Sequence, residues 1–322
     1  MALIIVMIGA LTAWLLLLAL IPLLRRGLLD QPNSRSSHSQ PTPRGGGLAF
    51  VLVAVAASVI PWSFGLTGPG ALLPLVVFPL ALVGLLDDRF NLPMGWRYGV
   101  QLFTACLLLA CSPLVHGLLG LWLLFLPVLL IASTAVTNFI NFMDGLDGLV
   151  AGCMAVALTA AALQLHAFLS IWALVGGLVG FLIWNWSPAR VFMGDVGSTF
   201  LGALFAGLVL QAPSWPDSLA LLLVATPLLG DACWCVIRRI LGGQPIFKAH
   251  RLHLYQRLHQ AGWTHARISS LYIVAMAVLA LALMLGGLGS VWIIALIQIL
   301  MGIWLDRNVA VPFPLASAAA DG

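Results

Sequence analysis

The sequence predicts an all-α, polytopic integral membrane protein with ten or eleven transmembrane helices. Of the 322 residues, 62% are hydrophobic and 7% are charged, whereas soluble domains carry about 25% charged residues. The mean hydropathy is correspondingly high, at +1.09. Apolar stretches close to the ~20 residues that a helix needs to cross a bilayer recur along the whole chain. We therefore expect a single transmembrane domain over residues 1–322 and exclude a water-soluble globular enzyme.

Glycine, proline and polar residues divide the apolar sequence into successive spans. The first is expected to remain as a helix and not to be cleaved as a signal peptide, because Arg25 and Arg26 follow it and no Lys or Arg precedes it. The fourth and fifth are separated only around Cys111 to Gly120, and the eighth is short, so the count is ten or eleven. The expected spans are 3–24, 46–62, 71–86, 98–115, 117–137, 149–166, 168–185, 199–212, 217–240, 268–287 and 289–305.

The charged residues divide the connections into two sets. All 14 Lys and Arg residues lie in or beside alternate connections, and the intervening connections contain none. By the positive-inside rule, the basic set faces the cytoplasm and the N-terminus faces outward. Eight of the ten acidic residues, all of them Asp, lie on the same side, so an active centre is expected there. The predicted cytoplasmic loops are 25–45, 87–97, 138–148, 186–198 and 241–267, followed by the tail after residue 305.

Two further function classes are disfavoured by composition. The net charge of +4 is spread over an apolar chain and gives no continuous basic face, so no nucleic-acid partner is expected. The five cysteines lie in or beside apolar segments without metal-type spacing to histidines, and we expect them to be small buried hydrophobes. Cys233 and Cys235 are two residues apart, which places them on different faces of a helix, so this pair is not expected to form a metal or redox site.

The strongest polar constellation is the run from Asn138 to Gly148. On a helix, Asn138, Asn141 and Asp144 recur every three residues and Asp147 continues the series, so their oxygen atoms would share one face. Oxygen ligands without thiol or imidazole suit Mg²⁺ or Mn²⁺ better than zinc. The alternative is a polar helix end with Asp and Asn caps.

Two shorter acidic motifs lie at other cytoplasmic span ends. Asp87 and Asp88 directly follow the span 71–86, and adjacent carboxylates repel each other unless a cation or metal lies nearby; capping of the next segment is the other interpretation. In the block 191–198, Asp195 lies between two glycines. Glycine permits close backbone approach to a phosphate, and a helix N-terminus attracts anions.

Two loops supply groups for binding phosphates and sugars. The connection 244–267 contains Lys248, His250, Arg251 and His253, and Lys, Arg and His side chains are suited to a nucleotide diphosphate; the segment also fits an interfacial amphipathic helix that holds anionic lipid headgroups. The first connection is rich in Pro and Gly and offers donors from Asn33, Arg35, His38 and Arg44.

With these residues in place, the chain resembles the polyprenyl-phosphate N-acetylhexosamine-1-phosphate transferase family, glycosyltransferase family 4. Five blocks together are specific, although each alone is weak. In family order they are PNSRSSHSQPTPRGGG (32–47), LLDDR (85–89), NFINFMDGLDGL (138–149), VFMGDVGS (191–198) and HRLHLYQRL (250–258).

The resemblance implies roles for individual residues. It implies that Mg²⁺, with Mn²⁺ as the alternative, is bound by Asn141 and Asp195. It also implies that the catalytic centre is lined by Asp87, Asp88, Asp144 and Asp147. The substrate-binding residues are then expected to be Asn33, Arg35, His38, Arg44, Asn138, Lys248, His250, Arg251 and His253.

The resemblance further implies transfer of an N-acetylhexosamine-1-phosphate from a UDP-sugar, of the UDP-GlcNAc, UDP-FucNAc or UDP-QuiNAc type, to undecaprenyl phosphate in the bacterial inner membrane. The sequence HRLH at 250–253 stands where the peptidoglycan-precursor branch has three consecutive histidines. This favours the initiators of O-antigen and common-antigen synthesis, and hence of lipopolysaccharide. Membrane lipids are expected partners, and the sequence leaves a homodimer open.

Two alternatives remain at this stage. Within the enzyme class, the alternative is the phospho-N-acetylmuramoyl-pentapeptide transferase of peptidoglycan synthesis. In another class, a transporter or lipid flippase would use intramembrane Asp residues along an ion pathway. That class predicts charges near mid-span and polar sites on both sides, whereas these acidic clusters lie at the cytoplasmic ends of the spans.

Overall fold

The computed structural model describes residues 1–32, 40–118, 120, 122–245 and 250–321. These residues form an assembly of helices with one two-stranded antiparallel sheet, in which Leu29 pairs with Pro43. The elements are α1 (Ala2–Gly27), β1 (Leu29–Asp30), β2 (Thr42–Pro43), α2 (Leu48–Ser63), α3 (Leu73–Phe90), α4 (Met94–Ala110), α5 (Pro113–His116), α6 (Trp122–Phe142), α7 (Leu149–Gln164), α8 (Leu169–Asn185), α9 (Asp195–Val209), α10 (Trp215–Val224), α11 (Thr226–Leu241), α12 (Leu254–Gln260), α13 (His265–Asn308) and α14 (Phe313–Asp321).

The prediction of an all-α polytopic membrane protein is confirmed. By length and composition, α1, the Leu123–Phe142 part of α6, and α13 are each apolar and long enough to cross a membrane, and the bent pair α10 and α11 makes a possible fourth span. Shorter apolar helices, α2, α7, α8 and α9, pack among them. Each of the eleven predicted apolar stretches coincides with helix for most of its length.

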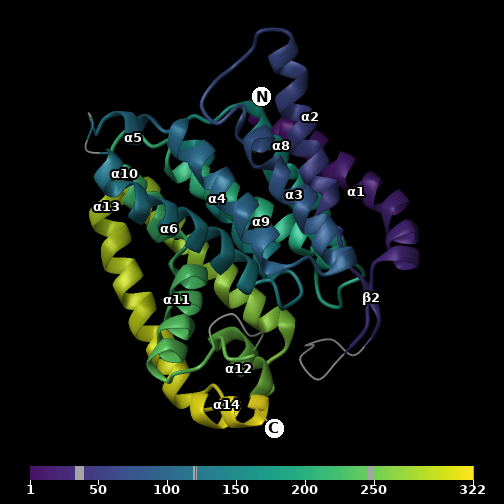
Figure 1. Ribbon diagram of the computed structural model, residues 1–322, viewed down its shortest axis with the longest axis vertical. Coiled ribbons are helices and arrows are strands. Elements are labelled where there is room, and N and C mark those ends of the chain that lie inside the picture. The colour runs from purple at the N-terminus through teal and green to yellow at the C-terminus, as the bar shows by residue number, and fades with distance from the viewer. Residues whose placement is uncertain (33–39, 119, 121, 246–249, 322) are drawn as a thin grey trace.

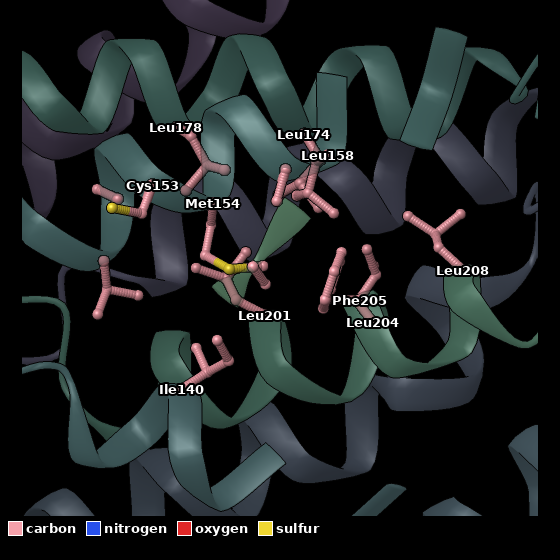
Figure 2. Packing of buried hydrophobic residues seen from close by; sticks show 14 of the residues in the cluster. Ile140, Cys153, Met154, Leu158, Leu174, Leu178, Leu201, Leu204, Phe205 and Leu208 are labelled. Atoms are coloured by element: carbon pink, nitrogen blue, oxygen red, sulfur yellow. The ribbon is translucent and has the colours of Figure 1, made fainter. Parts of the chain in front are cut away.

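Helix α9 forms the centre of the molecule. Every residue from Val196 to Val209 is buried, as expected for a helix that is apolar on all sides. Its neighbours include α3, α6 and α7. Buried side chains of four helices meet in the view of Figure 2, which labels Ile140 of α6, Cys153, Met154 and Leu158 of α7, Leu174 and Leu178 of α8, and Leu201, Leu204, Phe205 and Leu208 of α9.

Two of the predicted spans differ from simple helices. The stretch 217–240 is two helices, α10 and α11, that meet at an angle of 83°, and the Thr226 hydroxyl donates to the Leu223 carbonyl at the break, at 2.6 Å. The stretches 268–287 and 289–305 are the two arms of α13, which is interrupted at Gly287 (φ 64°). Because Gln298 of the second arm donates to the Ala275 carbonyl of the first at 2.9 Å, the second arm folds back along the first.

The predicted cytoplasmic connections gather at one end of the molecule. The first connection bonds to the fourth, since the Gly46 and Gly47 N–H groups donate to the carbonyls of Phe192 and Met193, both at 2.9 Å. Figure 1 shows α12 and α14 at the lower end, β2 on the right in the lower half, and the N-terminus and α5 toward the upper end. Among the cysteines, Cys153 and Cys235 are buried as expected, but Cys106 and Cys111 are exposed on the helix bundle.

Candidate active site

The C-terminal end of α3 meets the N-terminal end of α9. The Asp88 carboxylate accepts the backbone N–H groups of Asp195, at 3.2 Å, and Val196, at 3.4 Å. Such unpaired N–H groups at a helix N-terminus favour a negative charge. The two helices approach closely because Gly84 has no side chain: a Cβ there would lie 2.5 Å from the Asp195 carbonyl carbon. The fold therefore brings the block 85–89 into direct contact with the block 191–198.

Arg97 of α4 connects two of the carboxylates. Its guanidinium lies 3.0 Å from the Asp87 carboxylate and 3.4 Å from that of Asp195. The other oxygen of Asp87 accepts the Leu92 N–H at 2.7 Å. The sequence predicted a positive neighbour for the Asp87 and Asp88 pair but did not identify Arg97 as a site residue. The available signal was its position within the basic connection 87–97.

Arg44 is the positive neighbour of Asp88. Its guanidinium donates to the Asp88 carbonyl, and its Nε lies 3.8 Å from the Asp88 carboxylate. Predicted to bind substrate, Arg44 is placed where it also orients a carboxylate. Beside it, Gly47 packs against α9 so closely that a Cβ would lie 2.5 Å from the Gly197 Cα. The other residues predicted from this loop, Asn33, Arg35 and His38, lie outside the described residues, as does Lys248.

Asn141, predicted to bind metal, lies at the end of α6 beside the first turn of α9. Its side-chain oxygen accepts the Ser198 hydroxyl at 2.5 Å, and Ser198 lies one turn after Asp195. Helix α6 ends at Phe142, so the expected helical stripe does not continue to Asp144 and Asp147. The following run contains Gly145 and Gly148, and Gly148 has a φ of 72°, which favours a turn over more helix.

Asp144 lies in this turn with the other carboxylates around it. The pKa of Asp144 is raised from an ordinary 3.8 to about 8, mainly by burial, and the negative charges of Asp195, Asp88 and Asp147 contribute in the same direction. The cluster holds four carboxylates, Asp87, Asp88, Asp144 and Asp195, beside the two guanidinium groups of Arg44 and Arg97. Carboxylate and amide oxygens are the ligands that Mg²⁺ prefers, so the residues present fit a divalent hard cation.

Asn138, predicted to bind substrate, is connected to the carboxylates through Gln101. Its side-chain amide is paired with that of Gln101, by bonds of 2.8 and 3.3 Å, and its nitrogen also donates to the Thr134 carbonyl at 2.8 Å. Gln101 in turn lines a small cavity with Asp87, Arg97 and Asp195. Asn138 thus joins α6 to α4 behind the site.

Asp147, predicted to be catalytic, connects three segments. Its carboxylate lies 3.2 Å from Nδ1 of His265 and accepts the Ala189 N–H at 3.2 Å. Its carbonyl accepts the Ser269 hydroxyl at 2.7 Å. Burial alone would raise the pKa of Asp147, but the hydrogen bond and charge of His265 and the Ala189 N–H outweigh it and hold the pKa below 3.8.

We expect Asp147 to stabilise the fold in a pH-dependent way. Because its pKa is lower in the folded chain, its stabilisation is complete above the ordinary value of 3.8 and is lost as the pH falls through the lower folded value. Asp147→Asn should lower the free energy of unfolding at pH 7 by about 1–3 kcal/mol and flatten its decline in acid. Thermal unfolding in detergent between pH 3 and 7 measures both effects, and an unchanged acid profile in the variant would contradict this role.

The predicted binding segment around residue 250 packs beside the end of α6. The Tyr255 hydroxyl donates to the Phe142 carbonyl at 3.0 Å. Helix α12 is anchored by Asp231 of α11, whose carboxylate accepts the N–H groups of Leu254, at 2.7 Å, and Tyr255, at 3.0 Å, and the Tyr272 hydroxyl at 2.8 Å. The sequence did not single out Asp231, which lies in an apolar stretch without a recognisable motif.

An apolar cavity of about 360 Å³ lies between α11 and α13. Its walls include Trp234, Ile237, Leu271 and Ile303, and its charged lining residues include Arg238, Arg257 and Asp306. Arg238 lies 2.9 Å from the Asp306 carboxylate, and Arg257 also pairs with Asp306. The cavity therefore combines a long apolar wall with two guanidinium groups.

Comparison with known proteins gives a consistent result. The sequence model of glycosyl transferase family 4 matches residues 71–212. A probable undecaprenyl-phosphate N-acetylglucosaminyl 1-phosphate transferase of Bacillus subtilis is 27% identical, over 83% of this chain and 81% of its own. An undecaprenyl-phosphate α-N-acetylglucosaminyl 1-phosphate transferase of Haemophilus influenzae is 31% identical, over 83% and 80%. A phospho-N-acetylmuramoyl-pentapeptide-transferase of Desulforudis audaxviator is 33% identical, over 82% and 92%. The five motif blocks are in contact at one end of the bundle, and the relatives are similar over most of the length of this chain. The chain therefore belongs to glycosyl transferase family 4.

Proposed function

We propose that this protein transfers an N-acetylhexosamine-1-phosphate from a UDP-sugar to undecaprenyl phosphate and releases UMP. The observation that carries the proposal is the convergence of Asp87, Asp88, Asp195 and Asn141 at one end of an apolar helix bundle. A water-soluble diphosphate and a lipid phosphate can meet only at such a boundary. The names of the relatives from Bacillus subtilis and Haemophilus influenzae support the same reaction.

We place this end on the cytoplasmic face of a bacterial inner membrane, with the N-terminus outward. The positive-inside rule supports the orientation, since the basic connections gather at this end. UDP-sugars are cytoplasmic compounds, so the donor would reach the carboxylates without crossing the membrane.

Asn141 and Asp195 are the residues proposed to hold Mg²⁺. The oxygen-only donors and the carboxylates gathered around Asp144 support this choice. When bound, the ion would neutralise the donor diphosphate, which is the main electrostatic task of phosphoryl transfer. Asn141 is already oriented by Ser198, and Asp195 by Arg97.

The chain's own residues position the reacting phosphates. An oxygen of the lipid phosphate attacks the sugar-bearing phosphorus, the bond from that phosphorus to the bridging oxygen breaks, and UMP leaves. The anomeric carbon takes no part, so its configuration is retained. Asp87 is the proposed acceptor of a residual proton from the lipid phosphate, although a phosphate with a second pKa near 6 is mostly ionised at pH 7. Arg97 holds Asp87 and Asp195 at a fixed separation.

The basic segment is proposed to bind the sugar nucleotide. Arg251 and His250 lie in the connection that packs against the end of α6 through Tyr255. The apolar cavity between α11 and α13 is proposed to hold the polyprenyl chain, because its walls are apolar and Arg238 and Arg257 lie among its lining residues.

The proposal has a second part, which concerns the biosynthetic branch that the reaction serves. The HRLH sequence at 250–253 favours initiation of O-antigen or a related surface polysaccharide. The similarity to the Desulforudis audaxviator protein, at 33% identity, keeps phospho-N-acetylmuramoyl-pentapeptide transfer as the second candidate. The two differ in donor, which a direct assay can identify.

UMP release by purified protein tests both the transferase reaction and the biosynthetic branch. The assay supplies undecaprenyl phosphate, Mg²⁺ and either a panel of UDP-N-acetylhexosamines or UDP-N-acetylmuramoyl-pentapeptide. We expect release that requires the lipid and stops with a magnesium chelator. Activity with the pentapeptide donor alone would move the chain to the second branch, and folded protein inactive with every donor would contradict the transferase.

A further inference from the structure

A second cluster of metal-ligating side chains lies apart from the carboxylates. Cys235 of α11 and His250 and His253 of the segment before α12 have ligand atoms within 4.8 Å of one another. The three side chains come from two segments that are 15 residues or more apart in the sequence. Spacing along the chain could not reveal them, which is why the sequence analysis assigned no metal to any cysteine.

The donor types distinguish this cluster from the Mg²⁺ centre. One sulfur and two imidazole nitrogens suit Zn²⁺ and similar borderline ions, while Mg²⁺ selects oxygen. Zinc bonds of about 2.0–2.3 Å in a tetrahedral arrangement place ligands about 3.3–3.6 Å apart. Side-chain movements of about 1 Å therefore close the cluster around an ion.

Burial and a missing partner mark the cluster as a ligand site. Cys235 is 3% exposed and His253 is 2% exposed. Nδ1 of buried His253 has no hydrogen bond of ordinary length, since the Asp231 carboxylate beside it is 3.7 Å away. A buried polar group without a good partner is costly. If the other ring nitrogen binds an ion and Nδ1 keeps its proton, both nitrogens of the His253 ring have a role.

Asp231 completes the outer part of the site. Its carboxylate lies 3.7 Å from Nδ1 of His253 and is one helical turn from Cys235 on α11. A histidine that binds a metal through one nitrogen commonly presents the other to a carboxylate, which fixes the ring. Because Asp231 already accepts three hydrogen bonds from Leu254, Tyr255 and Tyr272, it acts as the orienting group and not as a ligand.

The rings are already arranged side by side. His250 and His253 are stacked with centroids 5.0 Å apart, and His253 stacks on Tyr255 at 5.7 Å. His250 is half-buried, which gives an ion access from the solvent side. The Leu252 N–H donates to Nδ1 of the His250 ring at 3.3 Å, a long hydrogen bond that is readily exchanged.

We propose that Cys235, His250 and His253 bind one Zn²⁺-type ion that fastens the 250–253 segment to α11. Binding forms bonds from the ion to the Cys235 sulfur and to the two imidazoles, and the thiol proton passes to solvent. A water molecule supplies the fourth ligand. The ion fixes the segment that carries Arg251 and is independent of the Mg²⁺ centre. With the ion bound, His250 is a metal ligand, and Arg251 is the residue of this segment that remains to bind the sugar nucleotide.

The test uses Co²⁺ as a spectroscopic probe on the full-length protein without a histidine tag. Titration should give one Co²⁺ per chain, with d–d absorption bands of tetrahedral cobalt and a thiolate-to-cobalt charge-transfer band. Zn²⁺ should abolish these bands, and millimolar Mg²⁺ should not. Absence of the charge-transfer band from folded protein would overturn the proposal.

Variants assign the ligands. Cys235→Ser should lose the charge-transfer band, and His250→Ala, at a half-exposed position, should weaken Co²⁺ binding at least tenfold while remaining folded. Cys233→Ser is the matched control, two residues away on α11, and should bind like the original protein. A band that persists in Cys235→Ser or disappears in Cys233→Ser refutes the assignment.

A final variant separates this proposal from the transferase. Asp195→Asn should bind Co²⁺ normally, because Asp195 lies in the other cluster. Normal cobalt spectra from the unsubstituted protein, with no UMP release by that same protein from any donor, would leave the zinc site supported and the proposed function refuted. Loss of the band in Asp195→Asn would contradict the independence of the two centres.

Discussion

Asp195→Asn is expected to reduce the rate of UMP release by about 10²–10³-fold or more, the usual cost of removing one electrostatic contact to a transferring group. The substitution keeps the size of the side chain but removes the charge that would balance the cation. It does not touch the Asp195 N–H that donates to Asp88, so α3 and α9 should remain joined. Steady-state rates at saturating donor and lipid measure the loss.

Asp217→Asn is the matched control for this result. Asp217 lies in the first turn of α10, at the other end of the molecule, where its carboxylate accepts the Ser214 hydroxyl at 2.5 Å. The same change of charge should leave the rate within about twofold, since no reacting group is near. Equal losses in both variants would show that the Asp195 effect comes from stability, and full activity in Asp195→Asn would contradict its assignment as a metal ligand.

Gly84→Ala is expected to cost about 100-fold in activity, although Gly84 contacts no substrate in the proposed mechanism. Its Cβ would lie 2.5 Å from the Asp195 carbonyl oxygen and 2.6 Å from the Val196 nitrogen, so the backbones of α3 and α9 would have to separate. A displacement of about 1 Å between catalytic groups can cost 10²-fold. The rate of UMP release and the thermal unfolding midpoint should both be measured.

Gly95→Ala provides the comparison. Gly95 lies in α4 near the same end of the molecule, and a Cβ there would meet nothing within 4 Å. Alanine favours helix over glycine by about 1 kcal/mol, so this variant should be active and slightly more stable. A fully active Gly84→Ala protein would show that α3 and α9 tolerate separation, and the close contact would then have no catalytic meaning.

Most of the architecture was predictable because the bilayer imposes a length and a polarity on every span. The apolar stretches became helices, and the basic connections gathered at one end with Asp88, Asp195 and Asn141 among them. The break between α10 and α11 was missed, although Pro227, the second residue of α11, is a signal for a helix start. Hydropathy records burial in lipid or protein and carries no information about a bend.

The residues that the sequence missed are defined by partners far along the chain. Arg97 matters because it lies between Asp87 and Asp195, and Asp231 because it accepts the N-terminus of α12. Conversely, Asp147 belongs to a motif block but is bonded to Ala189 and His265. Sequence patterns grouped these side chains by spacing, whereas their roles depend on which helix ends the fold brings together.

The complete enclosure of α9 has a consequence for adaptation to membranes. A helix of 15 residues is about 22 Å long, shorter than the ~30 Å hydrocarbon core, and would suffer hydrophobic mismatch if lipid touched it. Since protein surrounds α9, we expect peripheral helices such as α1, whose outer side chains are exposed, to adjust to a change in bilayer thickness by tilting. The depth of Asp195 and the distances between the reacting groups should then depend little on lipid composition.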